Sequence, residues 1–157
     1  MNELLFTNNT TGMSDILIAV DLSSFSSHVI HTGVQLAQSS QRSVILLSVV
    51  ELGISVGLPE TGPVYVDDVS ERVKQVEDQL AAYKAQYPDT PIQILVTTGY
   101  PKEEILAQAE ANRVSMIVTG THGRTGIDHM LLGSNAEYII RHSRIPVLVV
   151  PYNSTEH

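Results

Sequence analysis

The sequence predicts an α/β fold, a single three-layer domain in which helices cover both faces of a parallel β-sheet. Short β-branched apolar runs alternate along the chain with longer amphipathic stretches, and such alternation is typical of parallel sheets with right-handed crossovers. The runs are apolar at nearly every position, as in strands covered on both faces. The length of 157 residues fits one domain, which buries roughly 70% of its unfolded surface.

The first half of the chain is predicted to hold two strands and two helices. The strands are residues 16–20 and 43–50, and an irregular connection over 51–66 contains three glycines and two prolines. Residues spaced three or four apart mark the inward faces of the helices. In the first helix they are Phe25, Val29, Thr32 and Leu36, and in the second Val69, Val73, Val76, Leu80 and Tyr83.

The alternation extends through the second half of the sequence, with three strands and two helices. The predicted strands are residues 92–98, 114–119 and 146–150. Pro101 suits the first turn of the helix after the third strand, and residues 134–142 form the last helix. Because ligands of such sheets bind beyond the carboxyl ends of the strands, Asp21 and Gly120 are expected to be neighbours there.

Composition excludes several classes of function. The net charge of −8 argues against a nucleic-acid partner held by a basic surface. There is no cysteine, which excludes disulfides, thiol catalysis and cysteine metal sites. No apolar stretch approaches the ~20 residues that span a bilayer, and residues 1–12 lack a signal-like run, so we expect a cytoplasmic protein without membrane insertion.

The most informative motif is a glycine series that follows the fourth strand, Gly120-x2-Gly123-x9-Gly133-Ser134. Glycines allow backbone amides to approach an anion, and a helix start offers unpaired amides with partial positive charge. A strand, a glycine-rich loop and a helix start therefore predict an anion-binding site. The spacing matches neither the lysine-containing phosphate loop nor the dinucleotide fingerprint.

Asp21 and Ser134 each have two interpretations. Asp21 can accept hydrogen bonds from a ribose or hold a metal through water, or it can cap the following helix, and the residues alone do not decide. Ser134 with Glu137 fits a capping box, while the same serine can also reach a phosphate oxygen.

The remaining polar residues favour binding over turnover. Arg124 is a candidate donor to a polyphosphate, although a solvated surface position is the commoner one for a lone arginine. His122 and His129 have no partner at a recognisable metal-ligand spacing. No serine can be assigned an acid and a histidine from sequence, so we predict no catalytic residue.

These residues resemble the universal stress protein family. The glycine series resembles the ATP-binding signature of that family, residues 16–21 with Ser23 and Ser26 its opening strand, and residues 145–150 its closing strand. Gly99-Tyr100-Pro101 is similar to its third strand-to-helix turn. Ser48 stands where many members have histidine. The resemblance divides the protein into a flexible extension at 1–13, a universal stress protein domain at 14–152 and a tail at 153–157.

The resemblance implies a five-stranded parallel sheet in the order 3-2-1-4-5, a Rossmann-like layout of the adenine nucleotide alpha hydrolase-like type. Members with the full glycine motif tend to bind ATP. Carried over by position, Asp21 and Gly120 would meet the ribose, and Val49 the adenine, beside Val20 and Met116. The phosphates would be cradled by Gly123, Gly133, Ser134 and Asn135, with Arg124 as a weaker candidate.

The resemblance also implies Mg²⁺, held mainly by the nucleotide phosphates, and a homodimer formed through the last strand, Pro146 to Pro151. The expected role is regulatory, through nucleotide-dependent conformation and contact with a protein partner not yet known, with at most slow ATP hydrolysis or self-phosphorylation. The alternative is a nucleotide-free structural or interaction dimer. An adenylyl-transferring enzyme fits less well, because residues 21–25 carry neither a histidine-rich nor a serine-glycine-glycine loop.

Overall fold

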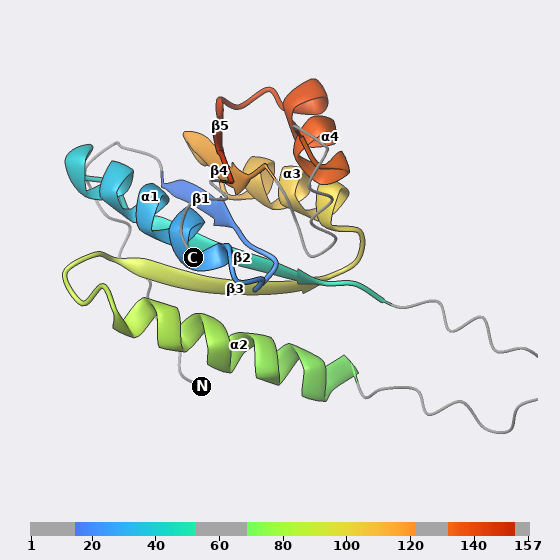
Figure 1. Ribbon diagram of the computed structural model, residues 1–157, viewed down its shortest axis with the longest axis horizontal. Helices are drawn as coiled ribbons and strands as arrows, with labels where there is room; N and C mark the ends of the chain where they lie inside the picture. Colours follow the sequence, from blue (N-terminus) through green and yellow to red (C-terminus); the bar gives the residue numbers. More distant parts are fainter. Residues whose placement is uncertain (1–14, 53–68, 122–131, 153–157) are drawn as a thin grey trace, which may run out of the picture.

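The computed structural model describes residues 15–52, 69–121 and 132–152. Strands and helices alternate along them (Figure 1). The strands are β1 (Ile16–Ala19), β2 (Val44–Val50), β3 (Ile92–Thr98), β4 (Met116–Gly120) and β5 (Val147–Val150). The helices are α1 (Ser26–Ser39), α2 (Val69–Ala85), α3 (Pro101–Ala111) and α4 (Ser134–His142).

The strands form one parallel sheet in the order β3-β2-β1-β4-β5, which confirms the predicted order. β1 lies at the centre, where its registers begin with the pairs Ile16–Val44 and Ile16–Met116. β3 and β5 form the two edges. The sheet reverses its direction of growth between β3 and β4, and the carboxyl ends of β1 and β4 therefore flank the switch point where ligands bind in such sheets.

Each face of the sheet has its own apolar core, because successive residues of a strand point to opposite faces. One core joins Ile16, Ile18 and Leu46 to buried residues of α1 and to Leu80 of α2. The other joins Leu17, Ile45, Leu47 and Ile117 to α3 and α4. Figure 1 shows α1 and α2 on one side and α3 with α4 on the other. The predicted three layers are confirmed.

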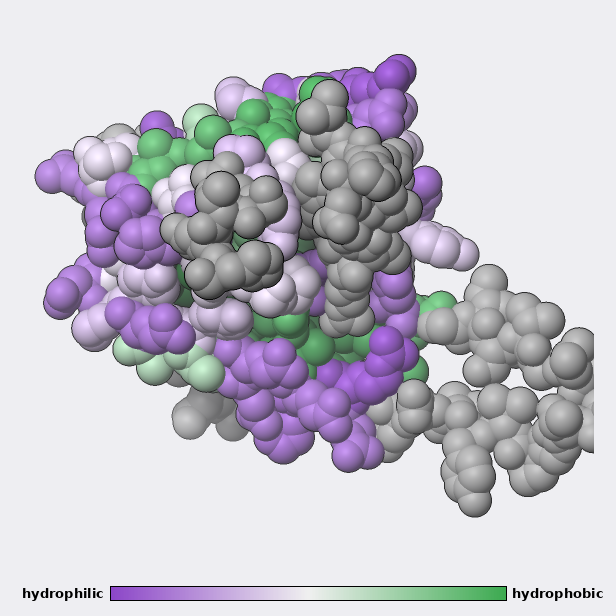
Figure 2. Space-filling view, viewed as in Figure 1, coloured by the Kyte–Doolittle hydropathy of each residue, from purple (hydrophilic) through white to green (hydrophobic). Residues whose placement is uncertain are grey.

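Helix α1 packs closely on the sheet through a glycine. A Cβ atom added at Gly33 would lie 2.5 Å from Cδ1 of Ile18, a residue with no exposed surface. Helix α2 covers the same face more loosely, and Leu80 is its one residue that is buried. Figure 2 shows hydrophilic residues along the outward side of α2. Helix α1 therefore packs tightly on the sheet, whereas α2 covers the same face with most of its residues accessible to solvent.

Element boundaries differ slightly from those predicted. β1 ends at Ala19, one residue early, and β4 begins at Met116, two residues late. The delay has a clear cause, because the amide of Val114 still donates to Ala109 O in the turn after α3, while Ser115 N donates to Asp15 O. Residues 134–142 and 92–98 are a helix and a strand as predicted.

Candidate functional site

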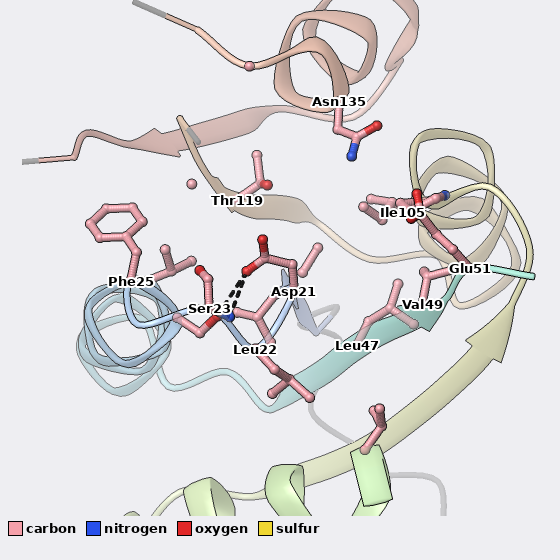
Figure 3. A pocket seen from close by; sticks show the side chains of 18 of the residues that line it. Asp21, Leu22, Ser23, Phe25, Leu47, Val49, Glu51, Ile105, Thr119 and Asn135 are labelled. Carbon is pink, nitrogen blue, oxygen red and sulfur yellow. Dashed lines mark hydrogen bonds between the residues drawn. The ribbon is translucent and has the colours of Figure 1, made fainter. Parts of the chain in front are cut away.

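A cavity of about 700 Å³ lies at the carboxyl edge of the sheet, within the size range of small-molecule and cofactor sites. Its walls come from the ends of β1, β2 and β4 and from each of the described helices α1 to α4. Figure 3 shows Asp21 near the middle, with Thr119 and Asn135 on one side and Leu47 and Val49 on another. Asp21 and Gly120 line this same space, so their predicted proximity is confirmed.

Asp21 is held by the turn between β1 and α1. Its Oδ1 accepts hydrogen bonds from Ser23 N at 3.0 Å and from Ser26 Oγ at 3.2 Å. The cap residue of α1 is Phe25, whose side chain makes no capping hydrogen bond. Asp21 therefore stabilises the turn before the helix rather than the helix end itself, and it lines the cavity at the same time.

The residue after Asp21 has an unusual backbone. Leu22 adopts φ 61°, in the left-handed region that costs a non-glycine residue of order 1 kcal/mol. Its side chain packs against the core on the α1 and α2 face. In Figure 3, Asp21 points toward Thr119, and Leu22 points away from it. The reversal at Leu22 thus leaves the carboxylate on the cavity side.

The start of α4 forms another wall, through Gly133, Ser134, Asn135 and Ala136. The predicted capping box is absent, because the cap residue is Gly133, which has no side chain to cap with, and Ser134 is already helical. Glu137 instead pairs with Arg141 at 2.8 Å. The first amides of a helix have no partner within it.

The amide of Gly133 is already engaged, since it donates to Thr121 O at 2.6 Å. The first bond within the helix runs from Glu137 N to Gly133 O. Among the described residues this leaves the amides of Ser134, Asn135 and Ala136 beside the cavity as donors for an anion.

Gly120 has a packing reason as well as a place in the cavity. An added Cβ atom would lie 3.0 Å from Cε1 of Phe25 and 3.2 Å from Cγ2 of Val29. Both neighbours belong to the α1 side and also line the cavity. The absence of a Cβ atom at Gly120 therefore lets α1 approach β4, whatever the cavity holds.

Val49 presents its main chain to the cavity. Leu47 O accepts from Val20 N on the β1 side, and Val50 O accepts from Gly99 N on the β3 side. Backbone groups alternate between the two edges of a strand, so those of Val49 point to the β1 side. The register with β1 ends at the Ala19–Leu47 pair, and β2 therefore extends beyond the end of its neighbour at Val49. Val20 also lines the cavity.

Met116 is a correction to the predicted set. It begins β4 opposite Ile16, at the amino edge of the sheet, and lines a smaller hollow there with Leu36 and Arg42. Its place at the wrong end of the strand excludes contact with the cavity. Gly123 and Arg124 lie outside the described residues.

Several wall residues were not predicted from sequence. Thr119 directly precedes Gly120 in β4 and is 8% exposed. Its position next to the first glycine of the series could have indicated that it is a wall residue. Pro101 and Ile105 also line the cavity, because the start of α3 lies at the carboxyl edge. The sequence indicates only a turn and a helix start at Pro101. No sequence pattern marks Arg72 of α2 as a wall residue, because only the crossover brings that helix to the cavity.

The charges around the cavity are few. Among the described wall residues Asp21 and Glu51 are acidic, and Arg72 is the only base. No cluster of three metal-ligating residues occurs in the described part of the protein. The described helices also include none with the length and apolar character needed to cross a bilayer.

Comparison with known proteins agrees with this geometry. Residues 13–151 match the model of the universal stress protein family. A universal stress protein of Methanocaldococcus jannaschii is 34% identical over 139 residues, covering 86% of this chain and 80% of the relative. One of Bacillus subtilis is 31% identical over 143 residues, covering 86% and 97%.

Solved structures share the fold. The universal stress protein UspA from Lactobacillus plantarum superposes with a TM-score of 0.71 at 24% identity, covering 87% of this chain and 97% of that one. Two others, at a TM-score of 0.60 and covering 87% of this chain and 96% of theirs, are a universal stress protein in complex with cAMP, 19% identical, and one from Archaeoglobus fulgidus in complex with dAMP, 18% identical. By sequence and by fold, this chain belongs to the universal stress protein family.

Proposed function

We propose that this protein binds ATP in the cavity at the carboxyl edge of the sheet and acts as a regulatory protein in the response to stress. The observation that carries the proposal is the meeting of three features in one space: the Asp21 carboxylate, the main chain of Val49 and the first amides of α4. Relatives of this fold in complex with cAMP and dAMP support an adenine nucleotide as the ligand class.

The β2 end of the cavity suits the base. An adenine edge carries a donor and an acceptor side by side, and the backbone carbonyl and N–H of Val49 offer the complementary pair. Apolar residues from β1, β2 and α3 surround this end, namely Ala19, Val20, Leu47 and Ile105. A flat apolar ring is stabilised by such a lining, at about 25 cal/mol per Å² removed from water.

The middle and the α4 end suit the sugar and the phosphates. Asp21 would accept hydrogen bonds from ribose hydroxyls next to Gly120. The amides of Ser134, Asn135 and Ala136 would receive phosphate oxygens, where the dipole of α4 adds partial positive charge. Gly123 and Arg124 remain part of this proposal on the strength of the glycine spacing.

A triphosphate enters a protein of net charge −8, past the carboxylates of Asp21 and Glu51. Mg²⁺ bound mainly by the phosphates would offset this repulsion, as a hard cation that keeps several waters and needs few protein ligands. We assign no catalytic residue, and we propose at most slow hydrolysis or self-phosphorylation.

We further propose that the protein works as a cytoplasmic homodimer that contacts a regulatory protein partner. β5 is an edge strand of apolar residues, and the outer main chain of such a strand can pair with a second strand. Residues 146–151 would then form the contact.

The second candidate is an interaction dimer that uses the same fold without nucleotide. The packing of Phe25 and Val29 against Gly120 favours it, because that contact explains one glycine of the series without any ligand. The two candidates separate in a single measurement of binding.

The test is the thermal midpoint of the purified protein with and without nucleotide. A ligand that binds only the folded state raises the free energy of unfolding by about 2.7 kcal/mol at a hundredfold excess over its Kd. ATP with Mg²⁺ should raise the midpoint more than GTP with Mg²⁺. A flat response to ATP up to millimolar concentration would leave the nucleotide-free dimer as the better proposal, and native mass spectrometry would report co-purified nucleotide.

A matched pair of variants locates the phosphate end. Gly133 and Tyr100 are both helix cap residues with extended backbone, φ −73° and −89°, so valine fits the backbone at either place. Gly133→Val should block the approach of phosphates and reduce the ATP-induced shift. Tyr100→Val should leave the shift unchanged, since that residue is 62% exposed. Equal shifts in both variants would refute this assignment of the phosphate end.

A further inference from the structure

The residues after β5 return to the wall of the cavity. Thr121 N donates to Val150 O at 3.0 Å, which closes the ladder between β4 and β5. One step further, Tyr152 N donates to Thr121 Oγ1 at 3.0 Å. Thr121 thus bonds to the end of β5 through both its backbone and its hydroxyl, and it also lines the cavity.

The same threonine holds the start of α4. Its carbonyl accepts the amide of Gly133, the cap residue of that helix, at 2.6 Å. Thr121 is therefore a joint between the end of β5 and the helix start that presents its first amides to the cavity. No cap from α4 itself fixes this helix start, because Ser134 and Glu137 do not form their box.

The segment after β5 also makes an aromatic contact with the α1 wall of the cavity. The ring of Tyr152 meets the ring of Phe25 edge-on, with centroids 5.2 Å apart and planes at 66°. Tyr152 is 46% exposed, while Phe25 lines the cavity and packs where Gly120 has no Cβ atom. The contact ties the segment after β5 to the α1 wall of the cavity, at the edge of the apolar core.

We propose that Thr121 is a positioning residue for the phosphate end of the cavity and that Tyr152 locks it in place. The proposal rests on the proposed ATP binding and specifies which part of the affinity the joint controls. A helix start held at one distance from Asp21 needs no ordering when a polyphosphate binds, and such preorganisation raises affinity. The joint therefore acts on phosphates and leaves the base and ribose contacts unchanged.

Three variants test the proposal by comparing ATP with adenosine in isothermal titration calorimetry. Thr121→Val keeps the shape of the residue and removes the acceptor for Tyr152 N. Tyr152→Ala removes the ring, while Tyr152→Phe keeps it. We expect the first two to weaken ATP binding about tenfold, with adenosine affinity within about twofold. Tyr152→Phe should keep more of the ATP affinity than Tyr152→Ala, because it retains the ring, and the control Tyr100→Ala should bind both ligands like the wild type.

A merely structural role would give a different pattern. If Thr121→Val and Tyr152→Ala lower the affinities for ATP and adenosine equally, or change neither, the positioning role is overturned.

Hydrogen exchange in the absence of ligand keeps this proposal separate from the proposed function. The amide of Gly133 should exchange faster in Thr121→Val and Tyr152→Ala than in the wild type, because its acceptor is less firmly held. Unchanged exchange in both overturns the joint. If the wild type binds neither ATP nor adenosine, the proposed function fails instead, and the exchange rates still decide whether the joint holds α4.

Discussion

Phe25 occupies the space that a side chain at Gly120 would enter, with Cε1 only 3.0 Å from the position of the missing Cβ. The contact joins the first turn region of α1 to the last residue of β4, and both residues line the cavity. The first glycine of the series therefore has a packing reason that involves no ligand, because a Cβ atom there would press on Phe25 and Val29.

Replacing Gly120 with alanine should therefore affect both the fold and the cavity. Phe25 and Val29 must move by a few tenths of an ångström, and overpacking of this kind costs about 1–3 kcal/mol. Urea unfolding should show the loss, and the ATP-induced thermal shift should shrink because Phe25 moves. A variant as stable as the wild type would mean that the ring yields freely.

Gly33→Ala should destabilise the protein without changing the ligand preference. The added methyl group would approach Cδ1 of Ile18 to 2.5 Å within the core, and we expect a loss of about 1–3 kcal/mol in the free energy of unfolding. Gln35→Ala is the matched control on the exposed side of the same helix, with an effect within about 0.5 kcal/mol. A Gly33→Ala variant as stable as the wild type would mean that Ile18 yields and that the higher helix propensity of alanine offsets the contact.

Asp21→Asn should weaken binding of adenosine about tenfold, the cost of one hydrogen bond from a ribose hydroxyl to a charged group. ATP should lose less affinity, because the variant also removes one of the carboxylates that repel the triphosphate. An asparagine oxygen can still accept from Ser23 N and Ser26 Oγ, so the turn should remain. Calorimetry is the measurement, with Asp78→Asn on the exposed face of α2 as the control. Undiminished adenosine binding would exclude Asp21 as the ribose contact.

Val149→Pro should prevent dimerisation through β5 and keep the sheet intact. Pro146 O and Val150 O face β4, where they accept from Ile117 and Thr121, so by alternation the main chain of Val149 faces the free edge. Proline there removes an outward N–H, which edge strands tolerate. Sedimentation should show a monomer. Leu148→Pro, which removes an N–H on the β4 side, should unfold the protein, and dimers persisting in Val149→Pro would place the interface elsewhere.

Tyr87 should make stability fall at alkaline pH. Its pKa is raised above 10.0 by burial of the phenol and, secondarily, by Tyr83. The unfolded protein then loses the Tyr87 proton at lower pH than the folded one, so stability is full below about pH 10 and declines above it. Urea titrations of wild type and Tyr87→Phe between pH 8 and about 11 should show a shallower decline in the variant. Parallel curves would contradict the prediction.

The sheet was well predicted from the sequence because its signals are local. Continuous apolar runs, Pro101 at a helix start and the glycine at the end of β4 each depend on sequence neighbours, and the elements they indicate lie close to where expected. The family resemblance supplied the strand order, which local patterns alone do not determine.

The cavity was predicted only in part, since it is assembled by crossovers. Asp21 and Gly120 were placed correctly because both lie at the carboxyl ends of strands, at the same edge of the sheet. The prediction for Met116 was wrong because Met116 is the first residue of β4. It therefore lies at the opposite edge of the sheet from Gly120, the last residue of the same strand. Arg72 and the Phe25–Tyr152 contact depend on packing between distant segments, for which a single sequence carries no signal.

The early end of β1 has an evolutionary consequence. By stopping at Ala19 while β2 runs on to Val50, the central strand uncovers peptide groups of its neighbour. Recognition that depends on such groups is insensitive to residue identity, so position 49 could exchange valine for another strand-forming residue without loss of the proposed contact. A site of this kind can be retained while the sequence diverges. The length of β2 relative to β1 is then a better guide to it than the residue at position 49.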